Sequence, residues 1–225
     1  MSADFVFVHG FTQTPTSWDP VADAIDASTR APLIPEAGDF VTTAHRLDVG
    51  RGTYVGYSMG GRLCLQLALD RPDHVERLVL VSASPGIADP AARAARREAD
   101  ERLAQEVERD GIAAFLERWL AQPLFATLPR DRSGIDERRA RNTVERLTYQ
   151  LRVLGQGVQP SNWERLGELR MPVLLIVGEL DTKYAEIARQ MAGGIPDARV
   201  EVISGAGHAC HVEQPNAVAH LLASW

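Results

Sequence analysis

The stretch that decides the fold is Thr53-Tyr54-Val55-Gly56-Tyr57-Ser58-Met59-Gly60-Gly61. Its apolar half, 53–57, predicts a buried strand, and residues 62–69, closed by Arg71-Pro72, predict a helix. Gly56 to Gly60 match the pattern G-x-S-x-G, in which a serine sits on a tight turn between strand and helix. The small flanking residues let the chain double back and hold the hydroxyl beside the helix N-terminus. A Gly/Ser turn without a function is the simpler alternative, but the strand and helix on either side favour a nucleophile.

The sequence on both sides of this turn alternates between strand and helix patterns. Continuous apolar runs predict strands at 4–8, 53–57, 78–81, 173–177 and 199–203. A weaker sixth run, 31–34, is interrupted by Pro32 and followed by Pro35, neither of which can donate to a sheet. Helical patterns lie at 18–25, 42–47, 62–69, 184–191 and 216–223. We therefore expect an α/β fold with a mainly parallel sheet of about six strands, covered by helices on both faces.

The strand signal vanishes between Gly86 and about Arg165, where the pattern is helical. Breaks in it are expected at Gly111, at Gln122-Pro123 and from Pro129 to Gly134. We expect a helical cap at 86–165 over the carboxyl edge of the sheet, where ligands bind in such folds, with 1–85 and 166–225 forming one core. Residues 91–152 hold 13 arginines against 11 acids, although the chain carries a net charge of −6. This relatively basic cap suggests an anionic ligand, but Arg/Glu pairs on solvated helix faces explain it equally well.

Composition narrows the class of protein. The chain has 225 residues, of which 45% are hydrophobic and 24% charged, so disorder, collagen and a disulfide scaffold are excluded. The net negative charge makes nucleic acid a poor partner. Cys64 and Cys210 lie in no metal-binding spacing, and a reducing cytoplasm fits them. No apolar run reaches the ~20 residues that a membrane helix needs, and a strand beginning at Asp4 leaves no room for a signal peptide. We expect a cytoplasmic monomer or small homo-oligomer with no membrane partner.

Two loops carry the groups that could activate the serine. A serine nucleophile or base needs a histidine, and the histidine needs an acid that holds its tautomer. Gly178-Glu179-Leu180-Asp181 follows the fourth strand, and Gly205-Ala206-Gly207-His208 follows the fifth. Both loops leave the carboxyl edge of the sheet, so Ser58, Asp181 and His208 are predicted to form a catalytic triad in this chain order.

Each loop offers a second candidate. Asp181 is preferred over Glu179 because two further residues let the chain turn inward from the strand end. His208 is preferred over His211 because Gly-x-Gly allows a sharp loop, whereas His211 is expected to open the last helix. Taken singly, Asp181 and His208 would be read as a surface acid and a buried structural histidine.

The loop after the first strand, His9-Gly10-Phe11, is a candidate for half of an oxyanion hole. Such a site needs two backbone N–H groups directed at one oxygen, one from the residue after the nucleophile and one from this loop. We assign Met59 and Phe11. The alternative is an ordinary loop with a buried histidine.

These motifs identify a family. The chain resembles the α/β-hydrolase superfamily throughout, and within it is similar to the 2-succinyl-6-hydroxy-2,4-cyclohexadiene-1-carboxylate synthases of menaquinone biosynthesis. The narrower resemblance is carried by Gly-Tyr-Ser-Met-Gly-Gly-Arg (56–62), Ser-Ala-Ser-Pro-Gly (82–86), Arg93-Ala-Ala-Arg96-Arg97, Trp119, Gln122-Pro123-Leu124-Phe125, Gly-Glu-Leu-Asp-Thr-Lys-Tyr (178–184) and Gly-Ala-Gly-His (205–208).

The resemblance implies a lyase that eliminates pyruvate from an enol ether without metal or cofactor. Removal of a proton begins the reaction, and the triad serine, here Ser58, is implied as the base. The resemblance also implies that Arg62 and Arg96 hold the carboxylates of a small anionic substrate, as the forked guanidinium can do with two hydrogen bonds. Tyr57 and Trp119 are implied to line the pocket.

Each substrate-binding assignment has a structural alternative: an ion pair for Arg62, a solvated helix position for Arg96 and a place in the cap core for Trp119. Lys183, the chain's single lysine, could pair with an acid as easily as contact substrate.

The chain departs from the family in one segment. Pro35-Glu36-Ala37-Gly38-Asp39 stands where the family's Gly-His-Gly-x-Ser stretch is usual, so a strand and a helix are trimmed.

The alternative function is a serine hydrolase (carboxylesterase, thioesterase or C–C bond hydrolase) with Ser58 as covalent nucleophile. A lyase should show converging arginines and a polar cavity, whereas an esterase should show an apolar acyl slot. A non-catalytic receptor on the same scaffold would have no need of the triad.

Overall fold

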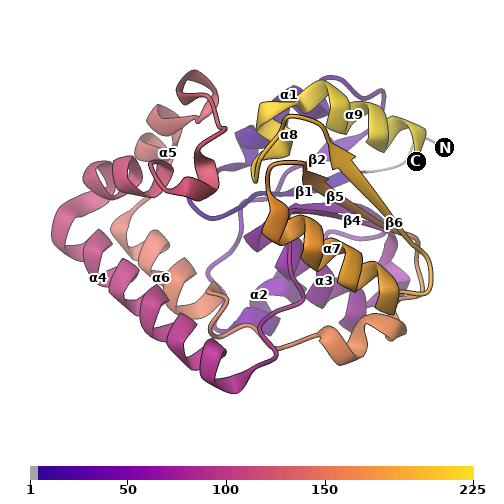
Figure 1. Cartoon of the computed structure of the whole chain (residues 1–225), viewed down its shortest axis with the longest axis horizontal. Coiled ribbons are helices and arrows are strands. Elements are labelled where there is room, and N and C mark those ends of the chain that lie inside the picture. The colour runs from indigo at the N-terminus through magenta and orange to yellow at the C-terminus, as the bar shows by residue number, and fades with distance from the viewer. Residues whose placement is uncertain (1–4) are drawn as a thin grey trace.

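A six-stranded parallel sheet forms the centre of the molecule (Figure 1). The computed structural model describes residues 5–225, so Asp4, expected to open the first strand, lies outside the described residues. The strands are β1 (Phe5–Val8), β2 (Thr29–Arg30), β3 (Gly52–Tyr57), β4 (Val75–Val81), β5 (Val173–Gly178) and β6 (Ala198–Ile203), in the order β2-β1-β3-β4-β5-β6. Every pair is parallel, which confirms the predicted α/β class and sheet.

The strands form where the apolar runs are continuous. Every residue of β1, β3 and β5 is buried, as both faces of a covered parallel sheet require. The sixth strand is displaced from its predicted place, because β2 spans Thr29–Arg30 rather than 31–34. Pro32 has no N–H to give to β1, so the chain leaves the sheet before it, and Ile34 packs into the core instead.

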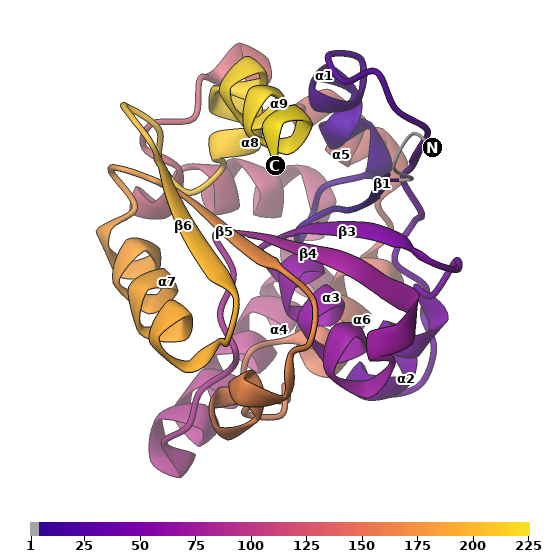
Figure 2. The same ribbon diagram turned by 90° about the vertical axis from the view of Figure 1, so that its right-hand side faces the viewer.

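Helices cover both faces of the sheet (Figure 2). One apolar core joins the sheet to α2 (Phe40–Arg46), α3 (Met59–Asp70) and α7 (Thr182–Gly194). A second joins the opposite face to α1 (Asp19–Ala22), α8 (Cys210–Glu213) and α9 (Pro215–Ser224). Residues 59–69 of α3 are all buried, so the helix that follows Ser58 runs through the middle of the protein. His211 lies in α8, not at the start of the last helix as expected, because Pro215 begins α9 separately.

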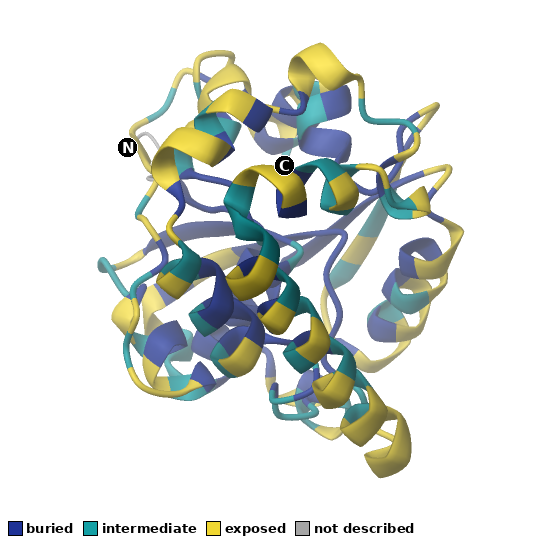
Figure 3. Cartoon of the chain, turned by 90° about the vertical axis from the view of Figure 1, so that its left-hand side faces the viewer, coloured by how far each residue is buried: buried dark blue, intermediate teal, exposed yellow. Residues whose placement is uncertain are grey.

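Three helices occupy the chain between β4 and β5, where the strand signal vanished: α4 (Pro90–Leu120), α5 (Ile135–Arg141) and α6 (Val144–Leu154). We call them the inserted helices. Figure 3 views this side, with exposed residues on their outward turns and the buried strands behind them. Gly111 interrupts α4 with φ 76° and ψ 168°, so the predicted break is confirmed. Short 3-10 turns at Pro123–Phe125 and Arg130–Arg132 connect α4 to α5. Among residues 5–225, no helix combines the length and the apolar character that crossing a membrane requires.

Candidate active site

Ser58 lies on a strained turn between β3 and α3. Its backbone has φ 48° and ψ −107°, a conformation that non-glycine residues rarely adopt. Its N–H donates to the Val81 carbonyl (2.9 Å), and its carbonyl accepts the first helical bond from the Arg62 N–H (3.0 Å). A side chain at Gly60 would overlap the Val8 carbonyl oxygen, so the first turn of α3 can pass this close to β1 only with glycine there. The predicted strand–serine–helix turn is thus confirmed.

Three side chains meet at the carboxyl edge of the sheet. His208 Nε2 lies 3.3 Å from Ser58 Oγ, and His208 Nδ1 lies 2.6 Å from Asp181 Oδ2. Because the carboxylate can only accept, Nδ1 carries the proton and Nε2 is left to accept from the serine hydroxyl. The side chains of His208 and Asp181 are 2% and 4% exposed, so water competes little for these bonds.

The backbone ties the two loops together. The Glu179 N–H donates to the Ile203 carbonyl and the Leu180 N–H to the Ala206 carbonyl, both at 2.9 Å. Asp181 is the N-cap of α7, where its Oδ1 accepts from the Tyr184 N–H (3.4 Å). This places Asp181 under the imidazole of His208.

The second candidates in these loops have other surroundings. The exposed Glu179 carboxylate accepts from Ser204 Oγ and the Gly205 N–H, away from His208. The His211 ring lies between Trp18 and Tyr57, at centroid distances of 4.4 and 4.2 Å. Burial holds the pKa of His211 well below its usual 6.5, so it is a neutral core residue.

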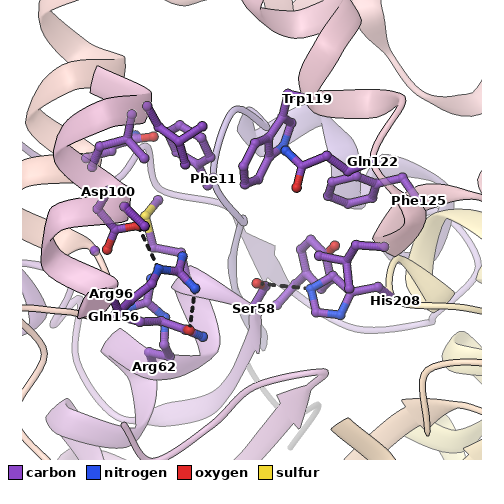
Figure 4. Close-up of a pocket in the computed structure, with 18 of the residues that line it drawn as sticks. Phe11, Ser58, Arg62, Arg96, Asp100, Trp119, Gln122, Phe125, Gln156 and His208 are labelled. Atoms are coloured by element: carbon purple, nitrogen blue, oxygen red, sulfur yellow. Dashed lines mark hydrogen bonds and ion pairs between the residues drawn. The ribbon is translucent and has the colours of Figure 1, made fainter. Parts of the chain in front are cut away.

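A cavity of about 320 Å³ opens beside Ser58, between the sheet edge and the inserted helices (Figure 4). Every residue proposed from the sequence lines it except Asp181, which lies behind His208. The lining includes Phe11 and Met59. Within residues 5–225 their backbone N–H groups donate to no acceptor, so both are available to a ligand.

Aromatic side chains form one wall of the cavity. The Trp119 ring stands perpendicular to Phe11 (5.0 Å between centroids), and the Phe125 ring lies 6.1 Å from that of His208. Trp119 was predicted either to line the pocket or to lie in the core of the cap, and it does both, since it also packs against Phe115 of α4. Among the described residues, Trp119 Nε1 and Gln150 Oε1 are buried without a hydrogen-bond partner. Tyr57 packs beneath His208, with 5.4 Å between ring centroids.

The two predicted arginines both line the cavity, in different electrostatic settings. Arg62 Nη1 donates to the Leu154 carbonyl (2.8 Å) and Gln159 Oε1 (3.1 Å), and no carboxylate of residues 5–225 pairs with it. Burial lowers the pKa of Arg62 to about 10, so it stays charged at neutral pH. Arg96 donates to Asp100 Oδ1 and Gln156 Oε1, each at 2.8 Å, and is already paired (Figure 4).

A third guanidinium in the cavity, that of Arg138 on α5, was not singled out from the sequence. Arg138 is 5% exposed, its Nε donates to the Ser133 carbonyl (2.8 Å) and its Nη1 to Thr12 Oγ1. Burial lowers its pKa to about 10, and it too lacks a carboxylate partner in the described chain. Its neighbours in Ile-Asp-Glu-Arg-Arg-Ala-Arg (135–141) read as a solvated helix, so only tertiary burial reveals it.

Lys183 lies at the exposed rim of the cavity. Its Nζ is 5.6 Å from the centre of the Tyr184 ring, and it forms no ion pair with residues 5–225. The alternative that it pairs with a neighbouring acid is therefore wrong. Within the same part of the chain, no group of three or more His, Cys, Asp or Glu side chains could hold a metal ion.

Comparisons with known proteins agree with this architecture. The α/β hydrolase fold family model matches residues 37–215. A Bacillus subtilis (strain 168) protein provisionally named 2-succinyl-6-hydroxy-2,4-cyclohexadiene-1-carboxylate synthase is 35% identical over 93% of this chain and 85% of its own. The synthase of that name from Salmonella paratyphi B is 30% identical over 97% of this chain and 91% of its own. The solved structure of MenH from S. aureus superposes with a TM-score of 0.91 at 28% identity, covering 99% of this chain and 92% of that one.

Proposed function

The chain belongs to the α/β-hydrolase fold family, and from that membership we propose that it is a carbon–oxygen lyase that eliminates pyruvate, with the reaction for which its synthase relatives are named. The observation that carries the proposal is the cavity beside Ser58. It combines a Ser58–His208–Asp181 hydrogen-bond chain with two buried guanidiniums, Arg62 and Arg138, that have no carboxylate partner within residues 5–225. Buried charges need partners, so this cavity suits a substrate with more than one carboxylate.

In the proposed reaction Ser58 acts as the base. His208 Nε2 takes the hydroxyl proton of Ser58, and Asp181 stabilises the imidazolium through Nδ1. The Ser58 oxygen removes a proton from carbon, the electrons of that C–H bond add a double bond to the substrate skeleton, and the C–O bond to the pyruvate-bearing oxygen breaks. His208 returns its proton to the departing oxygen, and the released enol becomes pyruvate.

The remaining lining residues bind and orient. The N–H groups of Phe11 and Met59 would stabilise negative charge that develops on a substrate carbonyl oxygen. Arg62 and Arg138 would each hold a carboxylate, with Arg96 contributing less because Asp100 already neutralises it. Tyr57 and Trp119 would line the site. No cofactor enters this scheme.

The second candidate is a serine hydrolase with Ser58 as covalent nucleophile. The aromatic wall of Phe11, Trp119 and Phe125 favours it, because such a surface can accept an apolar acyl group. Arg62 and Arg138 weigh against it, since an uncharged ester would leave both buried guanidiniums without an anionic partner.

A side-by-side assay tests the two. Purified protein would receive the enol-ether intermediate, with pyruvate release followed, and separately a short p-nitrophenyl ester. We expect pyruvate release at an ordinary enzymatic rate, on the order of 1–10³ per second, and its loss in Ser58→Ala. Ester turnover without pyruvate release would overturn the lyase in favour of the hydrolase. A cytoplasmic location and a monomeric or small homo-oligomeric state remain predictions.

A further inference from the structure

Glu213, the last residue of α8, buries its carboxylate beside the loop that carries His208. It is 6% exposed and forms no ion pair with residues 5–225. Burying a carboxylate without a counter-ion is unfavourable unless strong hydrogen bonds replace its hydration. The hydrogen bonds that Glu213 accepts therefore indicate which part of the chain its carboxylate holds in place.

Those partners are the two backbone N–H groups on either side of His208. The Gly207 N–H donates to Glu213 Oε2 (2.9 Å), and the Ala209 N–H donates to Glu213 Oε1 (3.1 Å). Hydrogen bonds from N–H groups to an ionised acceptor are stronger than those between neutral groups. Because peptide units are planar, holding the Ala209 amide fixes the plane of the peptide that follows His208, and holding the Gly207 amide restrains the chain that leads into it, so the two bonds together limit how the His208 side chain can be directed.

The geometry of His208 leaves little tolerance. Its ring must reach Asp181 on one side and Ser58 on the other, and the Ser58 contact of 3.3 Å is already at the long end of hydrogen bonding. A small rotation of the loop would break one contact or the other.

We propose that Glu213 is a positioning residue, whose buried carboxylate clamps the amides of Gly207 and Ala209 so that His208 reaches Ser58 and Asp181 together. This inference rests on the role proposed for His208, and it holds whether Ser58 acts as base or as nucleophile. Glu213 is itself tied to the turn between α4 and α5, because Arg132 Nη1 donates to the Glu213 carbonyl (3.0 Å).

Glu213→Gln is the first test. The glutamine oxygen can still accept one of the two bonds. Its NH₂ group, however, would face the other backbone N–H, so that bond is lost and two donors point at each other. We expect kcat, normalised to folded protein, to fall about 10- to 100-fold with little change in KM, since the substrate contacts remain. The matched control is Glu179→Gln: Glu179 accepts from the Gly205 N–H of the same loop, but is exposed, so water can replace it and kcat should stay within about two-fold.

Two measurements separate positioning from general stability. His208 Nδ1 lies 2.6 Å from Asp181 Oδ2, so the proton between them should give a low-field NMR resonance in the wild type. This resonance should move or disappear in Glu213→Gln. In wild-type protein the amides of Gly207 and Ala209 should exchange with solvent more slowly than that of Gly205. This second measurement applies even if the variant does not fold.

The outcomes are distinct. Wild-type kcat and an unmoved Nδ1 resonance in Glu213→Gln, equal losses in Glu179→Gln, or fast exchange at Gly207 and Ala209 would each overturn the clamp while the proposed function stands. If the wild type neither releases pyruvate nor hydrolyses the ester, the proposed function fails, and the resonance and exchange rates still decide whether Glu213 places His208.

Discussion

At the scale of single residues, Asp181 and Glu179 lie two positions apart and have different surroundings. The Asp181 side chain is buried under His208, whereas Glu179 is exposed and caps the neighbouring loop. In Asp181→Asn the amide can donate to Nδ1, which favours the wrong imidazole tautomer. We expect kcat to fall by about 10⁴-fold, as in serine proteases. Pyruvate release measured beside Glu179→Gln checks this, and near-normal turnover in Asp181→Asn would remove Asp181 from the triad.

Arg138 gives a second prediction at this scale. If its guanidinium binds a substrate carboxylate, Arg138→Met should lower kcat/KM, and the loss corresponds to about 2–5 kcal/mol of transition-state stabilisation. The neighbouring Arg139 on α5 pairs with Glu117 at the surface, so Arg139→Met should leave kcat/KM nearly unchanged. Steady-state kinetics of both variants, with circular dichroism to verify folding, decide the matter. Equal kinetics in the two variants would contradict a binding role for Arg138.

Sequence could predict some of these residues and not others, for a physical reason. Ser58, Asp181 and His208 each follow a recognisable strand, so their convergence follows from parallel topology. Arg138 and Glu213 carry no local signal, because their importance arises from burial by segments distant in the chain. Arg62 was reached only through the family resemblance of its motif, because its acceptors, at Leu154 and Gln159, lie more than 90 positions away.

At the scale of elements, prediction succeeded where apolar runs were continuous and failed at β2, one of the two edge strands of the sheet. Thr29 and Arg30 of β2 are exposed and polar, so no periodicity marks them. The nearby apolar residue Ile34 serves the core from outside the sheet. A two-residue edge strand is held by backbone pairing to β1, which composition does not encode.

The turn from β3 into α3 supports a prediction about one glycine. Gly60→Ala would force α3 away from the Val8 carbonyl, and we expect a loss of more than about 2 kcal/mol of unfolding free energy together with activity. Gly193→Ala is the control: nothing lies near a side chain there in α7, so it should be neutral or stabilise by about 0.4–1 kcal/mol. Urea unfolding compares the two variants. A Gly60→Ala protein as stable as Gly193→Ala would mean that the turn is less crowded than described.

At the scale of the whole molecule, two buried histidines predict sensitivity to acid. Burial lowers the pKa of His9 to about 4 and that of His211 well below 6.5. As pH falls, the unfolded chain therefore takes up protons near pH 6.5, whereas the folded protein takes them up only at lower pH. The effect of these two histidines is thus that the unfolding free energy is highest above pH 6.5 and decreases as pH falls toward 4. His9 alone should lower the unfolding free energy by about 2 kcal/mol between pH 7 and pH 5. Urea midpoints across this range test it, and a constant midpoint would contradict it.

The inserted helices are joined to α3 and to the loop before α2 by specific contacts. Arg62 of α3 donates to Leu154 of α6, and Tyr149 of α6 accepts from the Ala37 N–H at 2.8 Å. The second contact lies within Pro35 to Asp39, the segment where the sequence is expected to depart from the family. The division into a core and a cap at 86 and 165 remains a prediction, because sequence patterns place helices without telling how firmly they dock.

The location of Lys183 constrains how this protein can be handled. Apart from the N-terminal amine, it is the chain's one primary amine, and it stands at the cavity rim. Dyes, biotin or resin coupled to the Lys183 amine will therefore attach at the entrance and obstruct it. Thiol coupling is no substitute, since Cys64 and Cys210 are both buried. A tether for immobilisation is better provided by a cysteine introduced on the outward side of α9, with Lys183 replaced by arginine.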